Sequence, residues 1–166
     1  MKRTLCLALA AALLFAGPAL AIDPQEAAKQ AYDAGDYATA AKELTTLAAR
    51  GDAAAQYNLA IMYTQGKGVT KDYAAAAALF GKAARAGNAL AQYDLAMMYR
   101  DGVGLDKDLS RAWLWFDLAA LAQTGSDAAQ SAKARDDVAK KMTPEELQDA
   151  HDMDESCRQT EIRYCD

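Results

Sequence analysis

Apolar residues recur every three or four positions along most of the chain, which is the spacing of an amphipathic α-helix. Leu59, Met62 and Tyr63 show this spacing within one segment. Segments of this kind are separated by short polar stretches that contain glycine, such as TQGKGVTKD at 64–72 and RDGVGLDKD at 100–108. The pattern predicts an all-α protein with about seven to eight helices joined by tight turns.

One helical pattern occurs twice at a fixed interval. QYNLAIMYTQGKGV at 56–69 and QYDLAMMYRDGVGL at 92–105 are offset by 36 residues. The second half of the unit occurs three times, after Asp36, Asp72 and Asp108, and we expect Asp72 and Asp108 to be helix N-caps. Because periods of 20–50 residues are typical of solenoids, we predict stacked units of helix, turn, helix and turn.

The glycines of these units lie where a helix ends and the chain turns back. Gly66 and Gly102 suit the left-handed residue that closes a helix. Gly68 and Gly104 let the chain reverse without a clash involving a Cβ atom. Both pairs of glycines predict a hairpin of two helices joined by a turn.

Large aromatic residues are candidates for the core between the helix pairs. We expect Phe80, Trp115 and Phe116 to fill this volume. Trp113 stands where the preceding unit has Ala77. Trp113 therefore either packs against the terminal helix or is an exposed anchor for a partner.

The duplicated unit resembles the Sel1-like repeats, relatives of the tetratricopeptide repeats with a longer loop between the two helices. The residues that carry the resemblance are 55–87 and 91–125, whereas 26–51 has a turn five residues shorter and is more similar to a tetratricopeptide hairpin. The resemblance implies an α/α solenoid of stacked hairpins. Its expected parts are a signal peptide (1–21), a tetratricopeptide-like first hairpin (25–51), Sel1-like repeats (53–88 and 89–125), capping helices (126–157) and a tail (158–166).

The C-terminal part departs from the repeat. The register slips by two residues at Gly125, and Lys133 stands where the aligned units have leucine. End units of solenoids are expected to deviate because one of their faces meets water. The sequence TPEE at 143–146 predicts a capping box at the start of the closing helix, with Thr143 and Glu146 as its partners.

The N-terminus has the pattern of a secretory signal peptide. Two basic residues in 1–3 precede an apolar run at 4–16, and Ala19 and Ala21 are the small residues that a signal peptidase reads. We expect cleavage after Ala21, so that Ile22 is the first mature residue, and export to the periplasm. No downstream stretch has the apolar length of a membrane span.

The charge of the chain argues against nucleic-acid binding. Removing Lys2 and Arg3 from the 18 basic residues leaves 16 against 23 acidic ones, so the formal charge moves from −5 to −7. An electrostatic hold on nucleic acid needs a basic patch, and none is evident. An acidic surface favours a basic partner patch.

Two cysteines remain after the leader, Cys157 and Cys165. In an oxidising compartment a pair this close predicts a disulfide. Eight residues of straight helix rise about 12 Å, whereas the Cα atoms of bridged cysteines lie within about 7 Å. A bridge therefore requires the helix to break between them; the alternative is two unpaired thiols in a frayed tail.

No convincing active site is evident. His151 is the single histidine, and with Glu155 it has helical i, i+4 spacing, but a metal site needs a third converging ligand and a solvated acidic helix face explains the run more simply. The motifs GxSxG, SxxK and GxxxxGK[ST] are absent. We expect no enzyme activity, no metal and no cofactor.

The resemblance to Sel1-like repeats implies that the first helix of each unit lines the inner surface of the solenoid. Tyr57 and Tyr93 follow the usual repeat sequence and are alternatively half-buried scaffold residues. The lining residues carried over from the family are Tyr57, Asn58, Ile61, Thr64, Gln65, Tyr93, Asp94, Met97, Arg100 and Asp101. Several of these differ between the units, and aromatic, Met and Arg side chains are the types that dominate interface energies.

The resemblance implies an interaction module, since Sel1-like proteins are generally adaptors. We expect an exported, monomeric protein that presents a concave surface to a protein or peptide partner. A special case is a regulator that binds the periplasmic domain of a membrane sensor. The alternative is a small-molecule binder or a β-lactam-type hydrolase, since a cysteine-rich branch of the family pairs cysteines at the spacing of Cys157 and Cys165.

Overall fold

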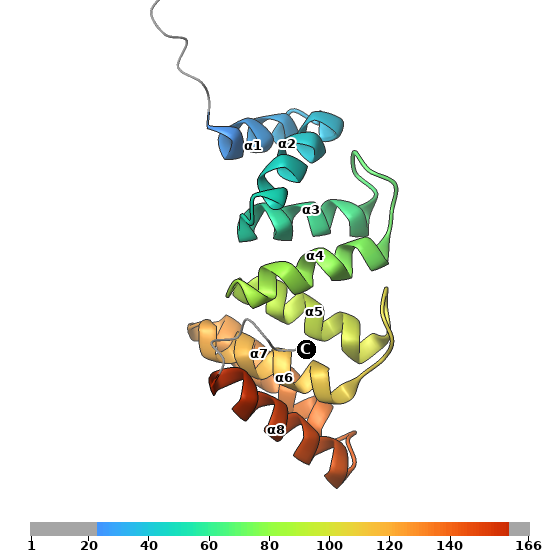
Figure 1. Ribbon diagram of the computed structural model, residues 1–166, viewed down its shortest axis with the longest axis vertical. Helices are drawn as coiled ribbons and strands as arrows, with labels where there is room; N and C mark the ends of the chain where they lie inside the picture. The colour runs from blue at the N-terminus through green and yellow to red at the C-terminus, as the bar shows by residue number, and fades with distance from the viewer. Residues whose placement is uncertain (1–22, 160–166) are drawn as a thin grey trace, which may run out of the picture.

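Residues 23–159 are described by a computed structural model, and within this range they form eight α-helices and no strand (Figure 1). The predicted all-α fold is therefore confirmed. The helices are α1 (Pro24–Asp33), α2 (Tyr37–Ala49), α3 (Ala53–Gln65), α4 (Tyr73–Arg85), α5 (Ala89–Asp101), α6 (Leu109–Ala122), α7 (Gly125–Ala139) and α8 (Pro144–Gln159).

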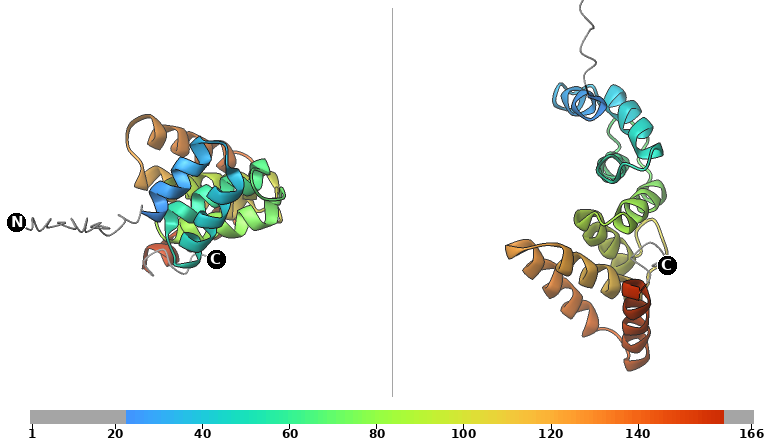
Figure 2. Two further views of the ribbon diagram at one scale, coloured as in Figure 1. Left: turned by 90° about the horizontal axis from the view of Figure 1, so that it is seen from above. Right: turned by 60° about the vertical axis from the view of Figure 1, so that its left-hand side comes forward.

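From α1 to α6 the helices follow one another along the long axis of the molecule, α7 and α8 both lie against α6, and the stack is curved (Figures 1 and 2). From α1 to α7 each helix packs against the next one in the chain, and α8 packs on α6. This is an α/α solenoid, as the repeat predicts. Its order follows from the short connections, which keep consecutive helices adjacent.

Helix starts are specified locally by acidic and amide side chains. Asp36, Asp72 and Asp108 begin α2, α4 and α6, and each carboxylate accepts a hydrogen bond from a backbone N–H of the first turn at 2.9–3.1 Å. The predicted N-caps Asp72 and Asp108 are confirmed. Asp52 and Asn88 cap α3 and α5 in the same way, at 2.7 and 2.9 Å. Each cap contributes about 1 kcal/mol.

The predicted capping box at the start of α8 is also present. The Thr143 N–H donates to Glu146 Oε2 at 2.8 Å, and the Glu146 N–H donates to Thr143 Oγ1 at 3.2 Å. At the other helix ends, Gly66 and Gly102 close α3 and α5 with φ near +70°. These left-handed residues are the predicted C-caps.

Buried glutamines join one hairpin to the next. Gln56 on α3 donates from Nε2 to the carbonyl oxygen of Ala48 on α2 at 3.1 Å. Gln92 on α5 makes the same bond to Ala84 on α4, also at 3.1 Å. Each bond gives a second partner to a carbonyl near the end of the preceding helix, which also accepts from the N–H of Gly51 or Gly87 in the turn at 3.1 and 3.0 Å.

The loop of the first repeat rests on the hairpin before it. Lys67 donates to the Tyr32 hydroxyl oxygen at 3.0 Å and lies 5.1 Å from the ring centres of Tyr32 and Tyr37. A Cβ atom on Gly68 would overlap with the carbonyl oxygen of Tyr37 and lie 2.9 Å from the backbone nitrogen of Ala38. Glycine is therefore needed here for a close approach between units, in addition to its role in the turn.

The same contact recurs one repeat later. A Cβ atom on Gly104 would overlap with the carbonyl oxygen of Tyr73, the first residue of α4, and would lie 2.9 Å from the Tyr73 Cβ atom. The repeat loops therefore tie each unit to the preceding one, through backbone contacts that only glycine permits.

The aromatic core lies where the sequence predicts it. Phe80, Trp115 and Phe116 are almost fully buried. Trp113 is buried as well, with its ring 4.9 Å from that of His151 on α8. Of the two alternatives for Trp113, packing against the terminal helix is the one observed.

A buried carboxylate fixes the two C-terminal helices on α6. Asp117 is 5% exposed and forms ion pairs with Arg135 on α7 at 2.6 Å and with Arg158 on α8 at 2.9 Å. Within residues 23–159 no group of three potential ligands could hold a metal ion. His151 packs edge-on against Trp113 instead.

Two sequence predictions, the disulfide and the leader, fall partly or wholly outside the described range. Cys157 is buried in the last turn of α8, but Cys165 lies beyond residue 159, so the disulfide stays a prediction. The leader at 1–21 also lies outside it. Between residues 23 and 159, none of the helices is long and apolar enough to cross a membrane.

Candidate functional site

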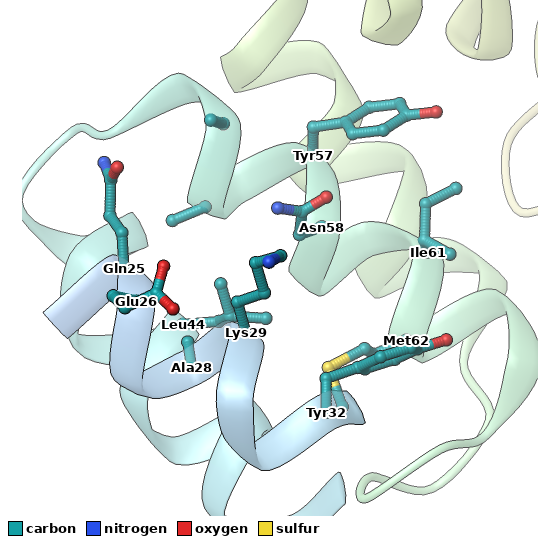
Figure 3. Close-up of a pocket in the computed structure, with 12 residues that line it drawn as sticks. Gln25, Glu26, Ala28, Lys29, Tyr32, Leu44, Tyr57, Asn58, Ile61 and Met62 are labelled. Atoms are coloured by element: carbon teal, nitrogen blue, oxygen red, sulfur yellow. The ribbon is translucent and has the colours of Figure 1, made fainter. Parts of the chain in front are cut away.

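A hollow of about 630 Å³ lies between α1 and α3. Lys29 on α1 and Asn58 on α3 point into it (Figure 3). Leu44 and Met62, both buried, close its floor. The complete lining is Gln25, Glu26, Ala28, Lys29, Tyr32, Leu44, Ala54, Ala55, Tyr57, Asn58, Ile61 and Met62.

A second hollow of about 210 Å³ lies between α3 and α5. Ile61 and Met97 face it from the two helices, and Phe80 on α4 lies beneath them. Tyr73 and Val103 at its edge are 40% and 36% exposed. The hollow is mainly apolar; its full lining is Ile61, Thr64, Tyr73, Phe80, Asp94, Met97, Met98 and Val103.

A third hollow of about 380 Å³ lies between α5 and α7 and is polar. Arg100, Lys133 and Lys141 supply three positive charges to its wall, against one negative charge from Asp137. Its full lining is Tyr93, Arg100, Gln130, Lys133, Ala134, Asp137, Val138 and Lys141.

The three hollows form one row along the odd-numbered helices, which we call the odd-helix groove. Ile61 lines both the first and the second hollow, and α5 supplies residues to both the second and the third. The groove therefore crosses α1, α3, α5 and α7 in turn. Its chemistry changes from mixed, through apolar, to basic.

Tyr57 lines the first hollow and is bonded to Asp94, which lines the second. Its ring packs 5.7 Å from that of Phe80, and its hydroxyl donates to the carboxylate of Asp94 on α5. Burial, followed by the negative charge of Asp94, raises the pKa of Tyr57 to about 12. Burial also raises the pKa of Asp94. The bond joins two units that are adjacent in the stack.

Tyr93 repeats this arrangement one unit later. Its ring lies 5.3 Å from that of Phe116, and Gln130 Nε2 on α7 donates to its hydroxyl oxygen at 3.0 Å. Both repeat tyrosines therefore support the scaffold and line the groove at the same time. The two alternatives drawn from the sequence, a lining residue and a half-buried scaffold residue, therefore apply together: each tyrosine ring packs on the core and also lines a hollow.

The sequence model of the Sel1 repeat matches residues 53–88 and 89–123, the two units that build the central hollow. The chain therefore contains two Sel1 repeats. Sel1-like repeats are commonly protein–protein interaction modules and typically non-catalytic scaffolds.

Two solved structures show the same Sel1-type architecture. One is a protective antigen present in uropathogenic Escherichia coli strains, with an SLR fold; it is 30% identical over 86% of this chain, with a TM-score of 0.73. The other is a Sel1 repeat protein from Oxalobacter formigenes, 29% identical over 66% of this chain, with a TM-score of 0.60. The chain spans 30% and 45% of their respective lengths. A comparison with curated protein sequences finds no match.

Eight of the ten lining residues expected from the Sel1-like resemblance lie around the groove. Gln65 and Asp101 line none of these three hollows. Asp101 instead pairs with Arg100 through two hydrogen bonds of 2.8 and 2.7 Å, which lower the pKa of Asp101 and raise that of Arg100. The role of these ten residues in binding stays a prediction.

The sequence did not indicate the outer walls of the groove. The first hollow takes Glu26, Lys29 and Tyr32 from α1, and the third takes Lys133 and Lys141 from α7 or just after it. These residues lie outside the two matched Sel1 repeats, and the leucine position of the repeat register at which Lys133 stands does not indicate that it lines a hollow. The one available signal was their place in helices adjacent to the repeats.

Proposed function

We propose that this Sel1-like repeat protein is an exported adaptor that binds a segment of a partner protein in the odd-helix groove. The observation that carries the proposal is the second hollow, where Ile61, Met97, Tyr73 and Val103 leave an apolar surface open to solvent. An open apolar hollow with a polar rim is typical of a binding site.

Variation between the repeats supports this assignment. At core positions the units agree, as Leu59 and Leu95 do, whereas at the groove Thr64 corresponds to Arg100. Packing alone would favour the same residue in each unit, since the units have the same shape. A surface that differs from unit to unit can select one partner sequence.

The proposed place of action is the periplasm. The basic start, the apolar run at 4–16 and the small residues before Ile22 support export through a cleaved leader. N-terminal sequencing of the protein purified from the cell envelope should give Ile22 as the first residue. A mature protein that retains residue 1 and stays in the cytoplasm would contradict this part of the proposal.

Substitution of Met97 by glutamate tests the groove. A buried charge in the second hollow should abolish partner binding, because the partner would have to desolvate it. Leu90→Glu is the matched control: Leu90 is also on α5 and 52% exposed, but it lines no hollow. Tyr93→Ala is unsuitable, since Tyr93 packs on Phe116.

The measurement is affinity capture from envelope extract with the full mature chain, alongside thermal melting of each variant. We expect a stoichiometric partner with the wild type and with Leu90→Glu, and its loss with Met97→Glu. All three proteins should keep one cooperative thermal transition, with a modest fall in melting temperature for Met97→Glu because Met97 is partly buried against the core. A partner held equally by all three proteins would refute binding in the groove. Hydrolysis of a β-lactam reporter without any captured partner would refute the proposal and favour the alternative of a β-lactam-type hydrolase.

A further inference from the structure

We infer that the odd-helix groove selects an extended peptide segment that carries an apolar side chain and, about three residues away, an acidic one. The inference rests on the proposed function and adds the chemistry of the partner. The apolar side chain would occupy the second hollow between α3 and α5. The acidic side chain would enter the third hollow between α5 and α7.

The charge of the third hollow is opposite to that of the whole protein. The chain has a formal charge of −5, yet Arg100, Lys133 and Lys141 face this hollow together with a single carboxylate, Asp137. The acidic protein therefore presents a local basic site. A negatively charged ligand group fits here. The acidic charge of the whole chain favours a basic partner, but this hollow favours an acidic one.

The carboxylate of Asp137 is already matched by its own neighbours. Lys133 and Lys140 lie 3.1 and 2.8 Å from it, and their hydrogen bonds lower the pKa of Asp137 to about 2. Arg100 is likewise already paired, with Asp101. Lys141 forms no direct ion pair with any residue between 23 and 159. Its charge acts on Asp101 only from a longer distance, as a minor cause of the lowered pKa of that carboxyl, so Lys141 is the cation best placed to meet a ligand.

The second hollow differs in chemistry from its neighbour. Ile61, Met97 and Val103 surround it, and Phe80 lies beneath. Its polar neighbour Asp94 is engaged by the Tyr57 hydroxyl. An apolar side chain can enter this hollow without leaving a polar group unpaired, which favours burial of such a side chain over burial of a charge.

The spacing of the two hollows sets the spacing along the peptide. The second and third hollows lie on either side of α5. An α-helix with its side chains is about 10–12 Å across, so the two hollows are separated by roughly that distance. An extended chain rises about 3.3 Å per residue. An apolar residue in one hollow therefore places the residue about three positions away in the next.

Selection from a displayed library of random peptides on the full mature protein tests the inference. We expect enriched peptides to combine an apolar residue with Asp or Glu about three positions away. A parallel selection on Lys141→Glu should enrich Lys or Arg at that position. Lys42→Glu makes the same change of net charge on the exposed face of α2, outside the groove, and should keep the acidic preference.

Fluorescence anisotropy with one enriched peptide gives the size of the effect. Lys141→Glu should weaken binding about three- to tenfold at low salt, and physiological salt should reduce this factor. The Lys42→Glu variant should bind as the wild type does.

The outcomes separate this inference from the proposed function. Enriched peptides that lose binding with Met97→Glu but show no acidic preference would overturn the inference and leave the groove intact. If no peptide is enriched, or if Met97→Glu leaves peptide binding unchanged, both the proposed groove function and this inference fail. Enrichment of a segment of this chain itself would point to self-association instead and overturn the inference.

Discussion

Substitution of Gly104 by alanine tests whether the repeat loops hold neighbouring units together. Gly104 has a φ of +77°, and its Cβ position is occupied by the backbone of Tyr73 in the preceding unit. Gly87 is a matched control, since it has a φ of +85° but no atom lies within 4 Å of the place that its Cβ atom would take. Both substitutions impose the same backbone strain, and only one adds a clash between units.

The expected destabilisation has two parts. Alanine in the left-handed region costs about 1–2 kcal/mol, and both variants should lose this amount. Gly104→Ala must also move the loop or the start of α4 away, because the added Cβ atom would lie 2.9 Å from the Tyr73 Cβ atom and closer still to its carbonyl oxygen. Forced overpacking costs about 1–3 kcal/mol more.

Urea denaturation followed by circular dichroism measures the difference. Gly104→Ala should be less stable than Gly87→Ala by about 1–3 kcal/mol, or roughly 3–9 °C in melting temperature for a chain of this size. The first repeat should show the same ranking, with Gly68→Ala less stable than Gly51→Ala. Equal losses within each pair would refute the close approach of the loops.

Two further predictions concern the end of the solenoid and its response to pH. Asp117→Asn should lower the free energy of unfolding, measured in urea, by about 2 kcal/mol; this value is reduced because the two arginine partners of Asp117 are partly exposed. The control Asp136→Asn should lower it by less than about 1 kcal/mol. Equal effects of the two substitutions would contradict the role of the buried carboxylate. The pKa of Tyr57 is raised to about 12 in the folded state. The corresponding stability is present below pH 10, the ordinary pKa of tyrosine, and is lost as the pH rises towards 12. Tyr57→Phe should therefore reduce the loss of melting temperature between pH 10 and 12, and an unchanged alkaline profile would count against a raised pKa of Tyr57 in the folded protein.

Much of the architecture follows from local signals. The 36-residue repeat, the aspartates at helix starts and the glycines at helix ends predict the hairpins, and the capping box at Thr143 and Glu146 predicts the start of α8. These signals are readable because they act within about one helical turn. The chemistry of each residue there is set by its immediate neighbours in the chain.

The groove and the joints between units depend on how the hairpins stack. No local pattern indicates that Gly104 touches Tyr73, that Asp117 meets arginines from two different helices, or that Lys141 faces a hollow with Arg100. Those contacts join residues far apart in the sequence, and they depend on the rotation and curvature of each helix pair relative to the next. Periodicity determines which face of a helix is apolar, but only the packed structure determines which surface that face meets and which hollows stay open.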